Sequence, residues 1–175
     1  MDDLYADNRN LRSMFVKRRI FYSFLLILWM GVIFYFSADE AQESSEKSME
    51  VCEGICDVFV VGYDELPRQE QLHRAEQLNF SVRKAAHFLE YTMLGILLVL
   101  ALAQYPVQRR ELAAVGIGFL YAMTDEFHQL FVSGRSGQLS DVAIDTAGVV
   151  CGVLICMAGR MLVRRMQGKS ADGAV

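Results

Sequence analysis

The sequence predicts an all-α integral membrane protein, built as a four-helix bundle with short extracellular amphipathic helices. Two properties of the whole chain support this class: 53% of its 175 residues are hydrophobic, and the mean hydropathy is positive. A soluble domain of this length is ordinarily less apolar. The third observation is that the apolar residues gather in four runs, which cover residues 20–36, 85–103, 112–132 and 142–157.

The first run decides between a membrane anchor and two alternatives. A helix needs about 20 residues to cross a bilayer core, and Tyr22, Trp29 and Tyr35 can extend the uncharged run 20–36 into the interface. A soluble bundle would give this helix a polar face, and it has none. A cleaved signal peptide would have a shorter apolar region followed by small residues at a cleavage site. We therefore expect an uncleaved first span.

Basic residues predict the orientation, because Lys and Arg mark the cytoplasmic side. With four spans, the basic groups before the first run, between the second and third, and after the fourth all fall on one side. We therefore expect a multi-pass protein with both termini cytoplasmic: a segment 1–19, a membrane domain 20–159 that includes an outer insertion 37–84, and a basic tail 160–175. The basic residues are Arg9, Arg12, Lys17, Arg18, Arg19, Arg109, Arg110, Arg160, Arg164, Arg165 and Lys169.

The outer insertion shows a helical pattern of its own. Apolar residues recur every three or four positions over residues 49–60, which predicts a short amphipathic helix on the outer surface or against the bundle. Cys52 and Cys56 lie one turn apart in it. Helical geometry suits a disulfide poorly at that spacing, so two free, buried thiols are favoured.

Beyond this segment, Pro67 favours a new helix start, because proline is tolerated in the first turn. The charged stretch that follows is expected to be solvated, with Asn79 or Ser81 capping the second span.

The second span carries a polar face at its outer end. Arg83, His87, Glu90 and Tyr91 follow a spacing of three or four residues, so they share one side of the helix. In the expected orientation this face starts at the outer surface and descends into the outer leaflet.

The third span ends in a second polar group. Asp125, His128 and Gln129 share one face, whereas Glu126 is rotated away by about 100° and is expected to be solvated or interhelical. Gly116 and Gly118, earlier in this span, are expected to allow close packing.

The fourth span returns from the outer side. Ser140 is a plausible N-cap, Asp141 in the first turn suits the positive helix end, and Asp145 lies one turn deeper. Gly148 and Gly152 form a small-xxx-small pair that predicts a close helix contact. Three spans thus bring ionisable groups to one level, and such groups inside a membrane usually mark function.

Three pieces of the sequence resemble the VanZ-like family of small bacterial membrane proteins. They are Phe36-Ser37, which partly keeps an FSS-type motif, the stretch RKAAHFLEY (83–91), and YAMTDEFHQLFVSGRSGQLSDVAID (121–145). The resemblance covers roughly residues 20–158. It implies a four-helix domain in the bacterial plasma membrane and an association with low-level resistance to the glycopeptide teicoplanin.

The polar residues suggest several roles. A histidine could act as a general base, oriented by Glu90 or Asp125. A divalent metal is possible as a cofactor, because imidazole and carboxylate groups lie one turn apart. The candidates for catalysis are His87, Glu90, Asp125, His128 and Asp145; those for metal binding are His87, Glu90, Asp125 and His128; those for substrate binding are Arg83, Lys84, Tyr91, Glu126, Gln129, Arg135 and Asp141.

The favoured function is a cell-envelope protein whose outward-facing polar pocket binds an envelope lipid, a peptidoglycan precursor or a glycopeptide. The alternative is a membrane-embedded enzyme, acid/base or metal-assisted, that acts on an envelope substrate. A third possibility is a structural lock, in which His87 pairs with Asp125, and Arg83 or Arg135 pairs with Asp141. The net charge of −4 and the absence of a basic stripe argue against nucleic acid. Transport is disfavoured because the cytoplasmic half lacks polar residues.

Overall fold

The structure, a computed structural model, describes residues 2–135 and 137–172, with side chains over 12–135 and 137–167. The side chains of Arg9 and Lys169, used above for orientation, lie outside that set. Within it, all regular structure is helical, which confirms the all-α prediction. The elements are α1 (Asp2–Ser37), α2 (Ala41–Phe59), the 3₁₀ turn η1 (Tyr63–Glu65), α3 (Arg68–Leu102), α4 (Arg110–Gln129) and α5 (Leu139–Asp172).

Three of the described helices are long and apolar enough to cross a membrane: residues 12–37 of α1, all of α3, and residues 139–167 of α5. Helix α4 is not among them, since acidic and other polar side chains occupy four of its last five positions: Asp125, Glu126, His128 and Gln129. Its 20 residues nevertheless extend about 30 Å, the thickness of a bilayer core. The structure thus supports three of the four expected spans by length and composition.

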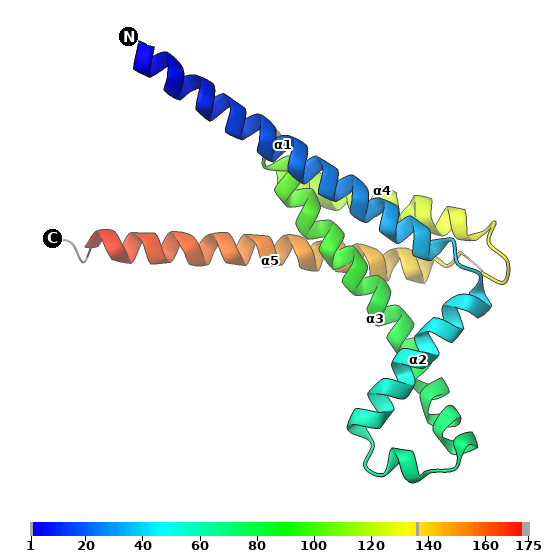
Figure 1. Cartoon of the computed structure of the whole chain (residues 1–175). Coiled ribbons are helices and arrows are strands. Elements are labelled where there is room, and N and C mark those ends of the chain that lie inside the picture. Colours follow the sequence, from blue (N-terminus) through cyan, green and yellow to red (C-terminus); the bar gives the residue numbers. More distant parts are fainter. Residues whose placement is uncertain (1, 136, 173–175) are drawn as a thin grey trace.

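The helices form a bundle with a projecting hairpin (Figure 1). Helices α1, α3, α4 and α5 make the bundle, and α2 projects from one end of it beside the first half of α3. The first turns of α1 and the last turns of α5 extend from the opposite end. The buried core centres on Tyr91, Leu94 and Leu98 of α3 and on Val149 and Val153 of α5.

Helices α3 and α5 cross at very short range because glycines line the crossing. A Cβ atom at Gly148 or Gly152 would overlap the backbone carbonyl of Phe88 or Thr92, respectively. The expected close contact of these two glycines is therefore present, and its partner is α3. On α4, a Cβ at Gly118 would meet the Val149 side chain, whereas Gly116 faces open space, so the packing expected at Gly116 is absent.

The outer insertion folds as a helical hairpin. Helix α2 begins at Ala41, eight residues before the expected start, and keeps Cys52 and Cys56 buried as free thiols, as predicted. Its last apolar residue, Phe59, is 79% exposed instead of packed.

Helix α3 begins directly after Pro67, as expected, but it then continues through the membrane run without a break. The prediction that Asn79 or Ser81 caps a separate span was therefore wrong. The Asn79 side chain instead joins the two arms of the hairpin: it donates to Ser45 Oγ at 3.0 Å and accepts from Ser48 Oγ at 2.5 Å. The local sequence favoured a helix cap at Asn79, but the polar atoms of this side chain form hydrogen bonds with α2 instead.

Polar contacts fasten the end of the bundle opposite the hairpin. The Arg19 guanidinium donates to the Gln104 carbonyl at 3.1 Å and lies 4.5 Å from the centre of the Tyr105 ring. Arg160 of α5 pairs with Glu111 of α4 at 2.5 Å. These contacts tie α1 to the connection between α3 and α4, and α5 to the start of α4.

Candidate functional site

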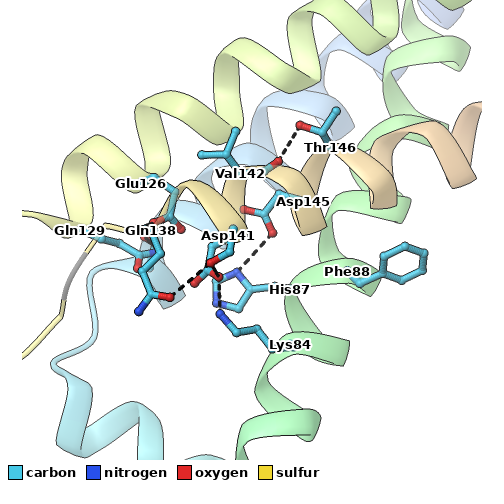
Figure 2. Close-up of polar contacts among 12 residues, drawn as sticks. Lys84, His87, Phe88, Glu126, Gln129, Gln138, Asp141, Val142, Asp145 and Thr146 are labelled. Carbon is cyan, nitrogen blue, oxygen red and sulfur yellow. Dashed lines mark hydrogen bonds and ion pairs between the residues drawn. The ribbon is translucent and has the colours of Figure 1, made fainter.

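Two polar pairs join α3 and α5 near the hairpin end of the bundle (Figure 2). Lys84 forms an ion pair with Asp141. Asp141 lies in the first turn of α5, which is the position that the sequence predicted for it. One turn deeper, His87 Nδ1 lies 3.6 Å from Asp145 Oδ1, which is longer than a hydrogen bond. Helix α5 itself begins at Leu139, so Ser140 lies within the first turn and is not the N-cap.

These pairs differ from the lock considered above. That arrangement expected His87 to face Asp125 and an arginine to hold Asp141, whereas Asp145 and Lys84 take those places. The residue spacing within each helix correctly predicted how far along the helix each polar side chain lies. It could not predict which carboxylate at that level would face which basic side chain.

Three buried acids from two helices meet beside His87; we call Asp125, Glu126 and Asp145 the carboxylate cluster. One carboxylate oxygen of each lies within 4.8 Å of the others. Their exposed fractions are 3%, 5% and 0%. Burying ionised carboxylates without partners is costly, so such a cluster needs protons or a cation to be stable.

Glu126 is the unexpected member of the cluster. It was expected to be solvated or interhelical, and the structure bears out the interhelical alternative: its Oε2 accepts a 2.8 Å hydrogen bond from the backbone N–H of Gln138, just before α5. Figure 2 shows its side chain pointing from α4 toward α5.

His128, by contrast, lies apart from the cluster. Its ring packs on Phe34 of α1, with ring centroids 4.4 Å apart, and it lines neither cavity described below. Asp125 and His128 share one broad helical face, but that face contacts two different neighbours. Of the four residues predicted as metal ligands, only Asp125 belongs to the carboxylate cluster.

Two adjacent cavities open beside these residues. The first cavity, of about 250 Å³, lies among α1, α2 and α3, and Asp125 of α4 forms part of its wall. The second cavity, of about 330 Å³, adjoins the loop before α5 and is more polar. Arg83, His87 and Arg135 line both. The first cavity is completed by Ile33, Phe36, Ser37, Asp39, Ser44, Lys47, Ser48, Val51, Val82, Ala86, Glu90 and Asp125.

Three basic side chains, Lys47, Arg83 and Arg135, line the first cavity together with three acidic ones, Asp39, Glu90 and Asp125. Arg135 is half-buried in the α4–α5 loop, and one of its NH2 groups donates to the Phe36 carbonyl at 3.3 Å. Burial lowers the pKa of Arg135, and the nearby Arg83 guanidinium lowers it further. Hydrogen bonds to Asp39 and Glu43 raise the pKa of Lys47, which keeps it cationic.

The Phe36-Ser37 pair at the end of α1 contacts the end of α4 and the α4–α5 loop. Ser37 is buried, and its Oγ lies 3.2 Å from the Gln129 side-chain nitrogen, which donates to it. With Arg135 on the Phe36 carbonyl, the end of α1 is fixed to both the end of α4 and the α4–α5 loop. These residues position the wall of the first cavity.

The remaining candidates also lie around the cavities. Glu90 lines the first cavity, and Gln129 and Lys84 line the second. Tyr91 is completely buried, one turn from His87. Sequence reasoning missed the contribution of α2, where Lys47 lines the first cavity. The one available signal was that Lys47 is the sole lysine of the acidic stretch 38–66.

Comparison with known proteins gives one result. A family model described as VanZ/LLP1 matches residues 22–163, which is well over half of the chain and includes all the site residues above. Neither the curated proteins nor the solved structures show a significant match. The chain therefore belongs to the VanZ/LLP1 family.

Proposed function

We propose that this chain is a multi-pass protein of the bacterial plasma membrane whose outward-facing pocket binds an anionic amphiphile of the cell envelope. A phospholipid and a lipid-linked peptidoglycan precursor share this chemistry. Resistance to glycopeptides such as teicoplanin, which the family resemblance implies, would follow from engagement of such a molecule or of the antibiotic itself.

The proposed topology has four spans, with α4 as the fourth. Its length suffices for a crossing, and α4 packs along α5 with its polar end at the cavities. Basic side chains gather at the opposite end of the bundle, where Arg19 and Arg160 make the contacts described above. Because basic residues favour the cytoplasm, that end is assigned to the inside and the hairpin to the outside.

The composition of the first cavity is the observation that carries the proposal. One part of its wall is apolar, formed by Ile33, Phe36 and Val51, and this part suits an acyl or prenyl chain. Arg83 and Arg135 line the same cavity, and guanidinium groups suit phosphate and carboxylate oxygens. An apolar wall in the same cavity as two arginines matches an amphiphile with an anionic head.

Binding can be measured on the full-length protein in nanodiscs of zwitterionic lipid. The three probes are phosphatidylglycerol, a fluorescent prenyl-diphosphate-linked peptidoglycan precursor, and teicoplanin. Arg135→Gln should weaken binding of the true ligand about tenfold or more, because a hydrogen bond to a charged group is lost. Arg74→Gln is the matched control: Arg74 pairs with Glu70 on the surface of α3 and lines neither cavity.

The three probes distinguish the possible sources of the ligand. Preference for the precursor over phosphatidylglycerol would assign the pocket to peptidoglycan synthesis, and preference for teicoplanin would assign it to the antibiotic. Equal affinity of the wild type and Arg135→Gln for all three probes would contradict the proposal. In bacteria that express the protein, Arg135→Gln should also lower the teicoplanin concentration needed to stop growth.

An enzyme is the second candidate, and the His87–Asp145 pair favours it. His87 lines both cavities, and Asp145 faces its Nδ1, an arrangement in which a carboxylate orients a catalytic imidazole. His87→Gln keeps a polar group of similar reach but cannot exchange protons as imidazole does. If that variant retains resistance and binding, the pocket is a binding site; if both the Gln and the Ala variants lose a turnover reaction while the protein stays folded, it is an enzyme.

A further inference from the structure

The carboxylate cluster has more buried negative charge than its surroundings balance. Lys84 is committed to Asp141, and Lys47 to Asp39 and Glu43. Arg135 lies near Asp125 and Glu126 but donates to the Phe36 carbonyl, and a single guanidinium could offset only one of the three carboxylates. His87 reaches only Asp145, at 3.6 Å. Three acids at such short range cannot all stay ionised without a compensating cation.

The oxygen atoms of the cluster have free coordination capacity. Within the described part of the chain, both oxygens of Asp125, both of Asp145 and Oε1 of Glu126 are buried without a hydrogen-bond partner. Buried polar atoms are normally satisfied, so several in one place call for an explanation. An ion at this position would satisfy all three side chains at once.

The spacing of the three carboxylate oxygens fits a metal ion. Because no two of these oxygens are more than 4.8 Å apart, there is a point that lies within 4.8 Å divided by √3, about 2.8 Å, of all three. Calcium–oxygen distances are about 2.3–2.6 Å, and magnesium–oxygen distances about 2.0–2.1 Å. Small rotations of the side chains would therefore close the site around a calcium-sized or manganese-sized ion.

Tyr91 supplies an independent indication. Its side chain is fully buried, and its hydroxyl has no hydrogen-bond partner among the described residues. Asp125 and Asp145 lie close enough to Tyr91 to act on it electrostatically. The Tyr91 hydroxyl could donate to one of these carboxylates or to a water bound to an ion.

We propose that Asp125, Glu126 and Asp145 bind a hard divalent cation, such as Mn²⁺, Mg²⁺ or Ca²⁺, between α4 and α5. All-oxygen ligands favour these ions over zinc. Asp125 lines the first cavity, so the ion can enter from there. This ligand set differs from the one that helical spacing alone suggested, because Glu126 and Asp145 replace His87, Glu90 and His128. The site does not depend on the proposed amphiphile, since the metal alone tests it.

The test is Mn²⁺ binding to the full-length protein in detergent after removal of metals, measured by electron paramagnetic resonance with Ca²⁺, Mg²⁺ and Zn²⁺ as competitors. The wild type should bind one Mn²⁺, which an excess of Ca²⁺ or Mg²⁺ should displace. Asp145→Asn, Asp125→Asn and Glu126→Gln should each weaken Mn²⁺ binding at least about tenfold, since even loss of an outer-shell partner costs that much.

Asp141→Asn is the matched control. It removes a carboxylate of the same helix, one turn from Asp145, that is already paired with Lys84, so Mn²⁺ affinity should change less than about threefold. The amide variants of the cluster should also raise the melting temperature of the metal-free protein, because they relieve repulsion among the acids.

Two results would overturn the proposal. One is a wild type that binds no Mn²⁺ at about 1 mM, near the weak limit for protein sites of this kind. The other is an Asp141→Asn variant that loses as much affinity as Asp145→Asn. If the cluster variants do not fold, the wild-type titration alone decides. A cluster held together by shared protons would give no Mn²⁺ signal and would be most stable at low pH.

Discussion

The close crossing of α3 and α5 should make Gly152 intolerant of even one added methyl group. A Cβ there would overlap the Thr92 carbonyl oxygen and approach the backbone nitrogen of Ile96. Backbone atoms cannot rotate away, so the two helices would have to separate by an amount on the order of 1 Å to regain normal contact distances. Overpacking of this kind costs about 1–3 kcal/mol.

The assay is thermal unfolding of the purified protein in detergent. For a chain of this size, about 1 kcal/mol shifts the melting temperature by roughly 2–4 °C, so Gly152→Ala should lower it by about 2–12 °C. Gly159→Ala is the matched control in the same helix, since a Cβ there meets nothing within 4 Å. That change should leave the melting temperature unchanged or slightly raised, because alanine is the better helix former. Equal melting temperatures for the two variants would refute the described packing of α3 on α5.

Three further predictions concern the outer hairpin and the topology. Hydrogen bonds from Arg68 lower the pKa of Glu53, so their contribution to stability is complete above the ordinary carboxyl pKa and is lost as pH falls through the lowered value. Glu53→Gln should therefore be less stable than wild type at pH 7 in thermal melts, and the difference should shrink as the pH falls below the ordinary carboxyl pKa; a difference that stays constant down to low pH would contradict the pairing. Burial raises the pKa of Cys52, and the nearby Cys56 raises it further, so a maleimide should label it slowly in the native protein and rapidly after unfolding; fast native labelling would show that the hairpin is open. In a cysteine-free background, a membrane-impermeant maleimide should label Asp64→Cys on intact cells but Gln108→Cys only after permeabilisation, and the reverse pattern would invert the topology.

The sequence was sufficient to predict that polar residues of different helices lie at the same level of the bundle. Spacings of three and four residues placed His87 on a polar face, and Asp145 one turn inside α5, at matching levels. The structure brings these two together, since His87 Nδ1 and Asp145 Oδ1 are 3.6 Å apart. The glycines of α5 likewise predicted a close helix contact, which forms against α3. These features depend on periodicity within one helix, which is readable from a single sequence.

What the sequence could not predict is how one helix is rotated against the next. Glu126 was placed off the polar face of its own helix, yet that side of α4 faces α5, so Glu126 enters the carboxylate cluster and His128 packs on Phe34. The sequence also could not predict that α2 contributes to the first cavity, because this too depends on how helices are placed against one another. Lys47 reaches the first cavity only because the hairpin folds back beside α3, and no local pattern encodes that placement.

Native mass spectrometry of the protein extracted from its own membranes tests the central claim most directly. A pocket lined by Arg83 and Arg135 predicts that the wild type retains an anionic amphiphile in stoichiometric amount. It also predicts that the double variant Arg83→Gln/Arg135→Gln, folded to the same extent, loses it. Retention of the same molecule by both proteins, or of zwitterionic lipid alone by the wild type, would contradict the account.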